Sequence, residues 1–170
     1  MNEMNSSADA RGALYISEES IKSAIETFNM SVEETIALRA ALKARNRAYA
    51  PYSQFKVGSA LLTVNGEIYA GCNVESSVYT LTTHAEGLAL DNMILGGGSD
   101  PALVAVVMES SHGEAMPCGV CRQKLSEFSS PDLAILGVRL EKGAIAAVYR
   151  TTLGQTLPNR FGAEIEKRSR

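Results

Sequence analysis

The chain has 170 residues, of which 45% are hydrophobic, and this is enough for one folded domain with a sizeable core. Its formal net charge of −3 and pI of about 5.5 argue against an extended phosphate-binding surface and therefore against a nucleic-acid-binding protein. No apolar run approaches the roughly 18 to 20 residues that a membrane-spanning helix needs.

The N-terminal residues and the cysteine count indicate the cellular compartment. Met1-Asn2-Glu3-Met4-Asn5 is polar and lacks the apolar core of a secretion signal. Three cysteines are an odd number, and two of them have the spacing of a metal site rather than of a disulfide framework. We therefore expect a cytoplasmic protein, kept reduced, with neither membrane nor nucleic acid among its partners.

Two helices are predicted before the first strand. Residues 1–16 are polar and small and are interpreted as a tail, and Ser17 can cap a short helix that extends the packed domain. Ser31 and Glu34 have the spacing of a capping box at the start of a second helix. That helix is expected to continue for about 18 residues, until Pro51 stops it.

A β-hairpin is predicted next. Residues 56–64 are rich in Val, Leu and Ala and have the length of a strand. Asn65-Gly66 is a strong signal for a tight hairpin turn. Residues 67–74 are therefore expected to return as the second strand.

Helices and strands alternate in the rest of the chain. A helix over residues 84–95, capped by Thr82 or Thr83, ends at three consecutive glycines. A buried strand over residues 102–108 and a helix over residues 118–128 follow. Two further strands, at 133–140 and 144–149, complete an order that predicts a single α/β domain with a mixed sheet covered by helices.

Three metal-binding side chains come from two separate motifs, Thr-His-Ala-Glu and Pro-Cys-Gly-Val-Cys. His84, Cys118 and Cys121 are suitable zinc ligands, and three protein ligands leave the fourth tetrahedral position open, as in a catalytic site. A His-x-Glu element followed by Pro-Cys-x-x-Cys is the signature of zinc deaminases that act on cytosine or adenine. Both ligand groups fall at predicted helix N-termini, where free N–H groups stabilise thiolates. We therefore expect one Zn²⁺ per subunit.

Glu86, two residues after the histidine, is the expected proton carrier of this site. It would take a proton from the attacking water, deliver it to ring N3 and later protonate the departing amino group. Its alternative role is that of a zinc ligand, which is disfavoured because His84 already fills that position.

A Cys-x-x-Cys pair by itself has other interpretations. It also fits a redox pair, half of a structural zinc site or a coincidence on the surface. A structural site needs a fourth ligand, for which Cys72 and His112 are the spare candidates. Free cysteine is usually buried, so Cys72 is interpreted as a small core residue, and His112 as a solvated loop residue. The joint occurrence of both motifs favours the catalytic site.

At these motifs the chain resembles the cytidine deaminase family, over about residues 31–163. The resemblance implies a three-layer α/β/α domain with a mixed five-stranded sheet. Residues 1–30 would then be an N-terminal extension, made of a tail and a short helix, and residues 164–170 a C-terminal tail. The matching segments are Ala48–Gly58, Gly71–Glu75, Tyr79, His84–Glu86, Pro117–Gln123 and Leu157–Gly162.

The resemblance also implies an activity: cytidine and 2′-deoxycytidine would be hydrolysed to uridine and 2′-deoxyuridine plus ammonia, in pyrimidine salvage. By the family pattern, Asn73 and Glu75 hold the ribose 3′-hydroxyl. Phe55 packs on the pyrimidine, and Ala85 meets the base through its backbone. Phe161 matches an aromatic residue that reaches a neighbouring subunit's site, so a homotetramer is implied.

Two departures from the family pattern bear on this expectation. Many one-domain members have Cys and Arg where this chain has His84 and Gly87. A histidine ligand brings the zinc centre to about zero net charge, which removes the need for the arginine, and Arg122 is expected to donate to a thiolate. Ser76-Ser77-Val78, beside the sugar-binding pair, also differs, and this leaves the breadth of substrates open.

Other functions fit the same motifs less well. A deaminase of a modified cytosine nucleoside, such as blasticidin S or an N4-substituted cytidine, would keep the zinc chemistry and change the sugar contacts. A polynucleotide-editing deaminase is disfavoured by the net charge of −3 and by the small number of aromatic residues. A non-catalytic zinc-binding interaction module would have no use for Glu86 beside an open coordination position.

Overall fold

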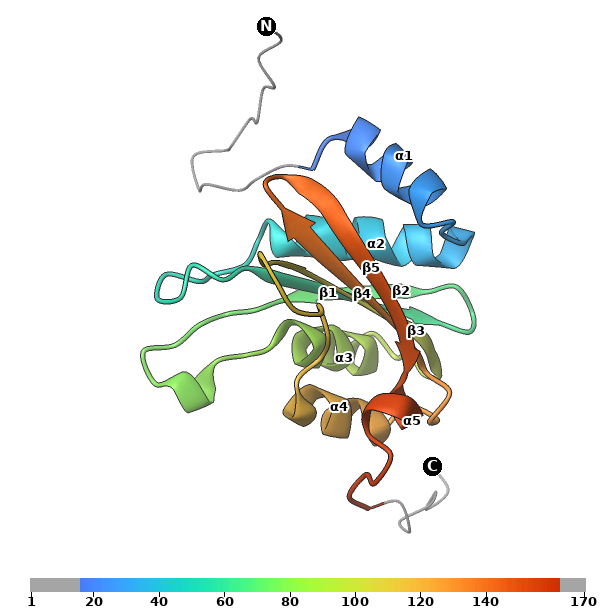
Figure 1. Ribbon diagram of the computed structural model, residues 1–170. Coiled ribbons are helices and arrows are strands. Elements are labelled where there is room, and N and C mark those ends of the chain that lie inside the picture. The colour runs from blue at the N-terminus through green and yellow to red at the C-terminus, as the bar shows by residue number, and fades with distance from the viewer. Residues whose placement is uncertain (1–15, 163–170) are drawn as a thin grey trace, which may run out of the picture.

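The computed structural model describes residues 16–162, and its helices and strands follow the predicted order (Figure 1). The tail predicted for residues 164–170, and all but residue 16 of the tail predicted for 1–16, lie outside the described residues. The elements are α1 (Glu18–Thr27), α2 (Val32–Arg45), β1 (Val57–Thr63), β2 (Ile68–Cys72), the 3₁₀ helix η1 (Tyr79–Leu81), α3 (Ala85–Leu95), β3 (Pro101–Glu109), α4 (Gly119–Ser126), β4 (Ala134–Glu141), β5 (Ala144–Thr152) and α5 (Leu153–Thr156).

The five strands form one mixed sheet in the order β2-β1-β3-β4-β5. Hairpins join β1 to β2 and β4 to β5, and β1 also pairs antiparallel with β3. Only β3 and β4 run parallel, and α4 lies in the crossover between them. The mixed five-stranded sheet expected from the sequence is therefore confirmed.

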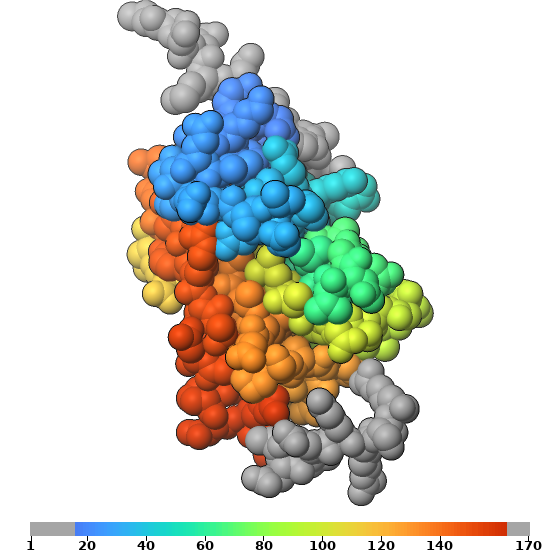
Figure 2. Space-filling model, turned by 90° about the vertical axis from the view of Figure 1, so that its right-hand side faces the viewer, coloured from blue at the N-terminus to red at the C-terminus, as the bar shows by residue number. Residues whose placement is uncertain are grey.

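Helices cover both faces of the sheet, so the molecule has three layers (Figure 1). Successive side chains of β1 point to opposite faces of the sheet: Ala60 and Leu62 pack with α1 and α2 on one face, whereas Leu61 packs with α3 and α4 on the other. Seen from the side, α1 and α2 form one end of the molecule, with β5 beside them (Figure 2). No helix in the described part of the chain is long and apolar enough to cross a membrane.

Helix ends that depend on local signals lie where the sequence predicts them. The Ser17 hydroxyl accepts a hydrogen bond from the N–H of Ser20 at 3.2 Å. At α2 both bonds of the capping box form, from the Glu34 N–H to the Ser31 hydroxyl at 3.1 Å and from the Ser31 N–H to the Glu34 carboxylate at 3.0 Å. The turn after β1 has Gly66 at φ +83°, as an Asn-Gly hairpin requires.

Two predicted helix boundaries are wrong, and both are overridden by pairing between distant segments. The second helix ends at Arg45 instead of about residue 49, because Tyr49 pairs with Val74 in an isolated β-bridge. Neither Thr82 nor Thr83 caps α3, because Thr83 forms a second isolated bridge with Val74. The N-cap is His84. The short helices η1 and α5 were not predicted.

A glycine lets α3 lie directly against the sheet. A Cβ atom on Gly71 of β2 would lie 2.4 Å from the carbonyl oxygen of Ala85 and 2.5 Å from the nitrogen of Ala89. Only glycine permits such a close approach of a helix backbone to a strand. The first turn of α3 is thereby seated on β2.

Candidate metal centre

The N-termini of α3 and α4 carry the residues that the sequence singles out. His84 is the N-cap of α3 and Cys118 the N-cap of α4, and neither side chain makes a capping hydrogen bond to its own helix. Glu86 and Cys121 lie in the first turns of the same two helices. Helix N-termini present free N–H groups and the positive end of the dipole, which favour thiolates and carboxylates.

The three predicted ligands converge on one point through a defined nitrogen of the histidine. Nδ1 of His84 lies 3.3 Å from Sγ of Cys118 and 3.4 Å from Sγ of Cys121, and all three atoms are within 4.8 Å of one another. In a tetrahedral zinc site, with Zn–S of about 2.3 Å and Zn–N of about 2.0 Å, donor atoms are about 3.5 to 3.8 Å apart. The arrangement therefore fits a single zinc ion.

The donor set holds three residues and not four. Among residues 16–162, the cluster of His, Cys, Asp and Glu side chains that could hold a metal contains His84, Cys118 and Cys121 alone. Cys72, at the end of β2, is half-buried and outside it. His112 lies in a loop, with Nδ1 2.8 Å from the hydroxyl of Ser111. Three protein donors leave a coordination position for water or substrate.

The acidic groups around the cluster also favour a bound cation. Glu86 is only 5% exposed, and this burial raises the pKa of its carboxyl group. The pKa of the Cys121 thiol is raised by burial first and then by the charges of Glu86 and Cys118. A bound dication offsets this repulsion and holds the thiols as thiolates. The residues present thus suit Zn²⁺ in both geometry and charge.

Asn73 and Phe55, two predicted substrate contacts, are joined by a hydrogen bond. The side chain of Asn73 is buried: Nδ2 donates to the carbonyl of Phe55 at 2.8 Å, and Oδ1 accepts from the N–H of Val57 at 2.8 Å. Both bonds tie the loop before β1 to the segment after β2. The ring-bearing residue Phe55 remains 41% exposed.

Glu75 is bonded to the same loop. Its Oε2 accepts from the N–H groups of Tyr52 at 2.9 Å and Ser53 at 3.2 Å, and its Oε1 accepts from the Ser53 hydroxyl. These bonds, the hydroxyl first, lower the pKa of the Glu75 carboxyl. Ser53 was not among the predicted site residues, although a serine in a tight loop is a common partner of neighbouring backbone groups.

The other predicted site residues lie on or beside the two helices. Ala85 is buried and opens α3, between His84 and Glu86. Arg122, on α4, donates from Nη1 to the carbonyl of Thr156, and its Nε is buried without a partner among the described residues.

Phe161 has an anchored backbone and an exposed side chain. Its N–H donates to the side-chain oxygen of Gln123 at 3.1 Å, and its carbonyl accepts from the side-chain nitrogen of Gln123 at 3.0 Å. The residue is nevertheless 82% exposed. The C-terminal segment is thus held on α4 while the aromatic ring projects into solvent.

A lysine occupies the space beside the glycine that departs from the family pattern. Nζ of Lys124, on α4, lies 2.6 Å from the Asp91 carboxylate and 3.4 Å from the carbonyl of Gly87, both on α3. The two ligand-bearing helices are therefore cross-linked by a cation that the sequence prediction did not include.

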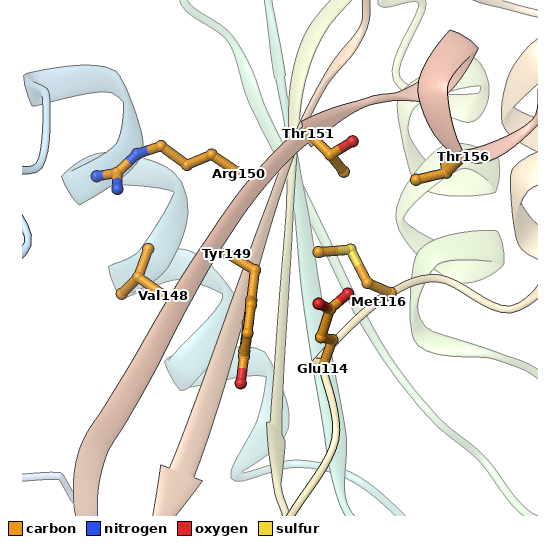
Figure 3. Close-up of a pocket in the computed structure, with 7 residues that line it drawn as sticks. All are labelled: Glu114, Met116, Val148, Tyr149, Arg150, Thr151 and Thr156. Atoms are coloured by element: carbon orange, nitrogen blue, oxygen red, sulfur yellow. The ribbon is translucent and has the colours of Figure 1, made fainter.

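A cavity of about 450 Å³ lies beside β5 (Figure 3). Arg150 points away from it, toward α2, where it pairs with Glu34. No predicted site residue lines this cavity. Its lining residues are Glu114, Met116, Val148, Tyr149, Arg150, Thr151 and Thr156.

Comparisons with known proteins agree with this arrangement. The family profile of the cytidine and deoxycytidylate deaminase zinc-binding region matches residues 31–136. A cytidine deaminase of Sporosarcina psychrophila is 41% identical over 135 residues, which cover 79% of this chain and 94% of the relative. A cytidine deaminase of Halalkalibacterium halodurans is 34% identical over 133 residues, covering 78% and 97%. The crystal structure of a cytidine deaminase from Burkholderia pseudomallei superposes with a TM-score of 0.69 at 40% identity, covering 78% of this chain and all of the other.

Proposed function

The chain belongs to the cytidine deaminase family, and from this premise we propose that it hydrolyses cytidine and 2′-deoxycytidine to uridine and 2′-deoxyuridine with release of ammonia, as an enzyme of pyrimidine salvage. One observation carries the proposal: three zinc donors meet at two helix N-termini, and the buried Glu86 carboxyl group lies in the first turn of one of these helices. This is the arrangement that a hydrolytic attack on an aromatic carbon requires.

We assign the zinc ion to His84, Cys118 and Cys121. A zinc ion held there would lower the pKa of a water molecule and so supply the nucleophile for attack at C4 of the base. The Lys124 bridge supports this assignment, because it links the helix of the histidine to the helix of the cysteines.

Glu86 moves the protons of the reaction. Its carboxylate accepts a proton from the attacking water and donates it to N3 of the pyrimidine. It then accepts the second proton of the water, as the new carbonyl forms at C4, and passes it to the amino nitrogen, which leaves as ammonia. Burial raises the pKa of this carboxyl group, which suits a group that must both take and give a proton.

The substrate is held by residues of three segments. The half-exposed ring of Phe55 packs on the pyrimidine, and the backbone of Ala85 meets the base. Asn73 and Glu75 bind the 3′-hydroxyl, for which an amide N–H and a carboxylate oxygen are a matched donor and acceptor. The exposed Phe161 supports a further proposal, a cytoplasmic homotetramer in which this ring completes the site of a neighbouring subunit.

A substrate panel with the purified zinc enzyme tests the activity. Cytidine and 2′-deoxycytidine should lose their amino group with one ammonia released per turnover, whereas cytosine, cytidine 5′-monophosphate and adenosine should react at least about a hundredfold more slowly. Faster turnover of the monophosphate, or of blasticidin S, would overturn the nucleoside assignment. Sedimentation velocity tests the tetramer, and a monomer that retains full activity would contradict it.

A further inference from the structure

The Ser53 hydroxyl joins two groups that the proposed function assigns to opposite ends of the substrate. It donates to Oε1 of Glu75, the proposed partner of the sugar, and accepts from the N–H of Phe55 at 3.0 Å, the proposed partner of the base. In the chain, Gln54 lies between Ser53 and Phe55 and has a positive φ of 59°, an uncommon conformation for a residue other than glycine. The loop therefore needs bonds such as these to keep its shape.

The hydrogen bonds of Glu75 leave one direction open to a ligand. A carboxylate has about four lone-pair positions, two on each oxygen. Both positions on Oε2 are taken by the N–H groups of Tyr52 and Ser53, and one on Oε1 is taken by the Ser53 hydroxyl. The remaining position, on Oε1, is the one to which a sugar hydroxyl can donate.

The neighbouring amide has a complementary capacity. Nδ2 of Asn73 uses one of its two N–H groups on the carbonyl of Phe55, and Oδ1 accepts from the N–H of Val57. One N–H group of Asn73 therefore stays available to donate to the same sugar oxygen. The sugar contact consists of one free acceptor and one free donor, each set by bonds to the loop at residues 52–57.

We propose that Ser53 is a positioning residue for substrate recognition: its hydroxyl holds the free lone pair of Glu75 toward the 3′-hydroxyl of the nucleoside. This inference rests on the proposed function, and it adds a residue that makes no contact with the substrate itself. Without the hydroxyl, the two N–H groups still hold Oε2, but Oε1 loses its own restraint, and the sugar hydroxyl loses a fixed acceptor.

The test compares Ser53→Ala with the native enzyme on cytidine and on 2′,3′-dideoxycytidine, which lacks the 3′-hydroxyl. On cytidine the KM should rise about five- to twentyfold with kcat changed less than about twofold, because a binding contact common to ground state and transition state is lost. On the dideoxynucleoside the KM values of the two enzymes should agree. Ser53→Thr keeps the hydroxyl and should restore the native KM for cytidine.

The matched control is Ser99→Ala. Ser99 is also a loop serine whose hydroxyl donates to a carboxylate, that of Asp100 at 2.7 Å, and its change should leave both KM values unaltered. An equal rise in KM on both substrates for Ser53→Ala would show that the hydroxyl only maintains the loop, and an unchanged KM for cytidine would show that it has no role. Either outcome overturns the inference.

A second variant separates this inference from the assignment on which it rests. Glu75→Ala should raise the KM for cytidine more than Ser53→Ala does. If Glu75→Ala leaves that KM unchanged, the sugar assignment itself is wrong and the inference falls with it. If the native enzyme does not deaminate cytidine at all, the proposed function fails first.

Discussion

At the scale of single residues, two glutamates near the site have opposite environments. Burial raises the pKa of Glu86, whereas hydrogen bonds from the loop at Tyr52 and Ser53 lower the pKa of Glu75. A carboxyl group with a raised pKa can exchange protons near neutral pH, and one with a lowered pKa stays an anionic acceptor. The same side chain is thus suited to catalysis at one position and to binding at the other.

The role of Glu86 is tested by Glu86→Gln. The amide keeps the size of the side chain but cannot accept and return a proton, so kcat should fall by about 10² to 10⁴-fold. The zinc content, measured with a chromogenic chelator after unfolding, should stay at one ion per subunit, because the three donors are untouched. Loss of the zinc would instead identify Glu86 as a metal ligand.

At the scale of elements, the site depends on how closely α3 lies against the sheet. Gly71 of β2 faces the first turn of α3 at backbone contact, and the same turn carries Glu86, two residues after the N-cap His84. The helix cannot be moved off the strand without moving the proposed zinc donor His84 and the proposed proton carrier Glu86 together.

Gly71→Ala should therefore damage both stability and zinc binding. The added methyl group would lie 2.4 Å from the carbonyl of Ala85, and such overpacking costs about 1 to 3 kcal/mol or more. Thermal unfolding and a zinc titration measure the two effects. The control is Gly87→Ala on α3, where the methyl group meets only Lys124 at 3.7 Å and should leave unfolding unchanged or raise its temperature.

The start of α2 is tied to β5 by an ion pair. Arg150 donates to both carboxylate oxygens of Glu34, at 2.6 and 2.9 Å, and also to the carbonyl of Phe28. Hydrogen bonding to Arg150 is the main reason why the pKa of Glu34 is lowered. Arg150 of the edge strand β5 is thus bonded both to the end of α1 and to the capping box of α2.

Glu34→Gln should lower stability in a pH-dependent way. Because folding lowers the pKa of Glu34, its contribution is present at neutral pH and disappears as the carboxylate is protonated below about pH 4. The variant should be less stable at pH 7 by about 0.5 to 1 kcal/mol, since Arg150 remains partly in solvent. Urea unfolding across pH 3 to 8 measures the difference. The control Glu19→Gln, in the exposed first turn of α1, should lose less stability at pH 7 than Glu34→Gln. Equal losses of stability in the two variants at every pH would contradict the prediction.

At the scale of the whole molecule, α1 closes one end of the core although it precedes the part of the chain that matches the family profile. Ile21 and Ala24 are about 5% exposed or less, Ile21 packs with α2 and the sheet, and Glu18 pairs with Arg39 at 2.8 Å. None of these residues belongs to the metal centre. We therefore expect the helix to contribute to stability and not to the chemistry.

Deletion of residues 1–30 should leave an active but less stable enzyme. Losing the buried Ile21 and Ala24 should lower the free energy of unfolding by about 2 to 4 kcal/mol. The kcat for cytidine at low temperature should stay within about twofold of the native value, because the donors and Glu86 are kept. Deletion of residues 1–15 is the control, since it removes none of the contacts described above. A fall in kcat to background with zinc still bound would show that α1 has a direct role in the site.

The amino-acid sequence by itself determined the features that depend on neighbours in the chain. The caps at Ser17 and Ser31, the hairpin turn at Gly66 and the order of the elements follow from local hydrogen bonds and from periodicity, and the structure confirms them. The sequence also predicts three zinc donors, because few residue types bind zinc and their motifs are specific, and the structure brings these three side chains together. The roles proposed for the substrate contacts stay predictions.

Only the tertiary structure decided what depends on distant partners. The helix end before Tyr49 and the N-cap at His84 were set by bridges to Val74, which no local pattern encodes. The N-caps of α3 and α4 are 34 residues apart in the chain, and the two helices pack side by side only in the folded protein. This packing places Nδ1 of His84 beside the cysteines and lets Lys124 link the two helices. The bond from Ser53 to Glu75 likewise spans 22 residues. Residue types determine which chemistry is available, but contacts between remote segments determine where each donor points.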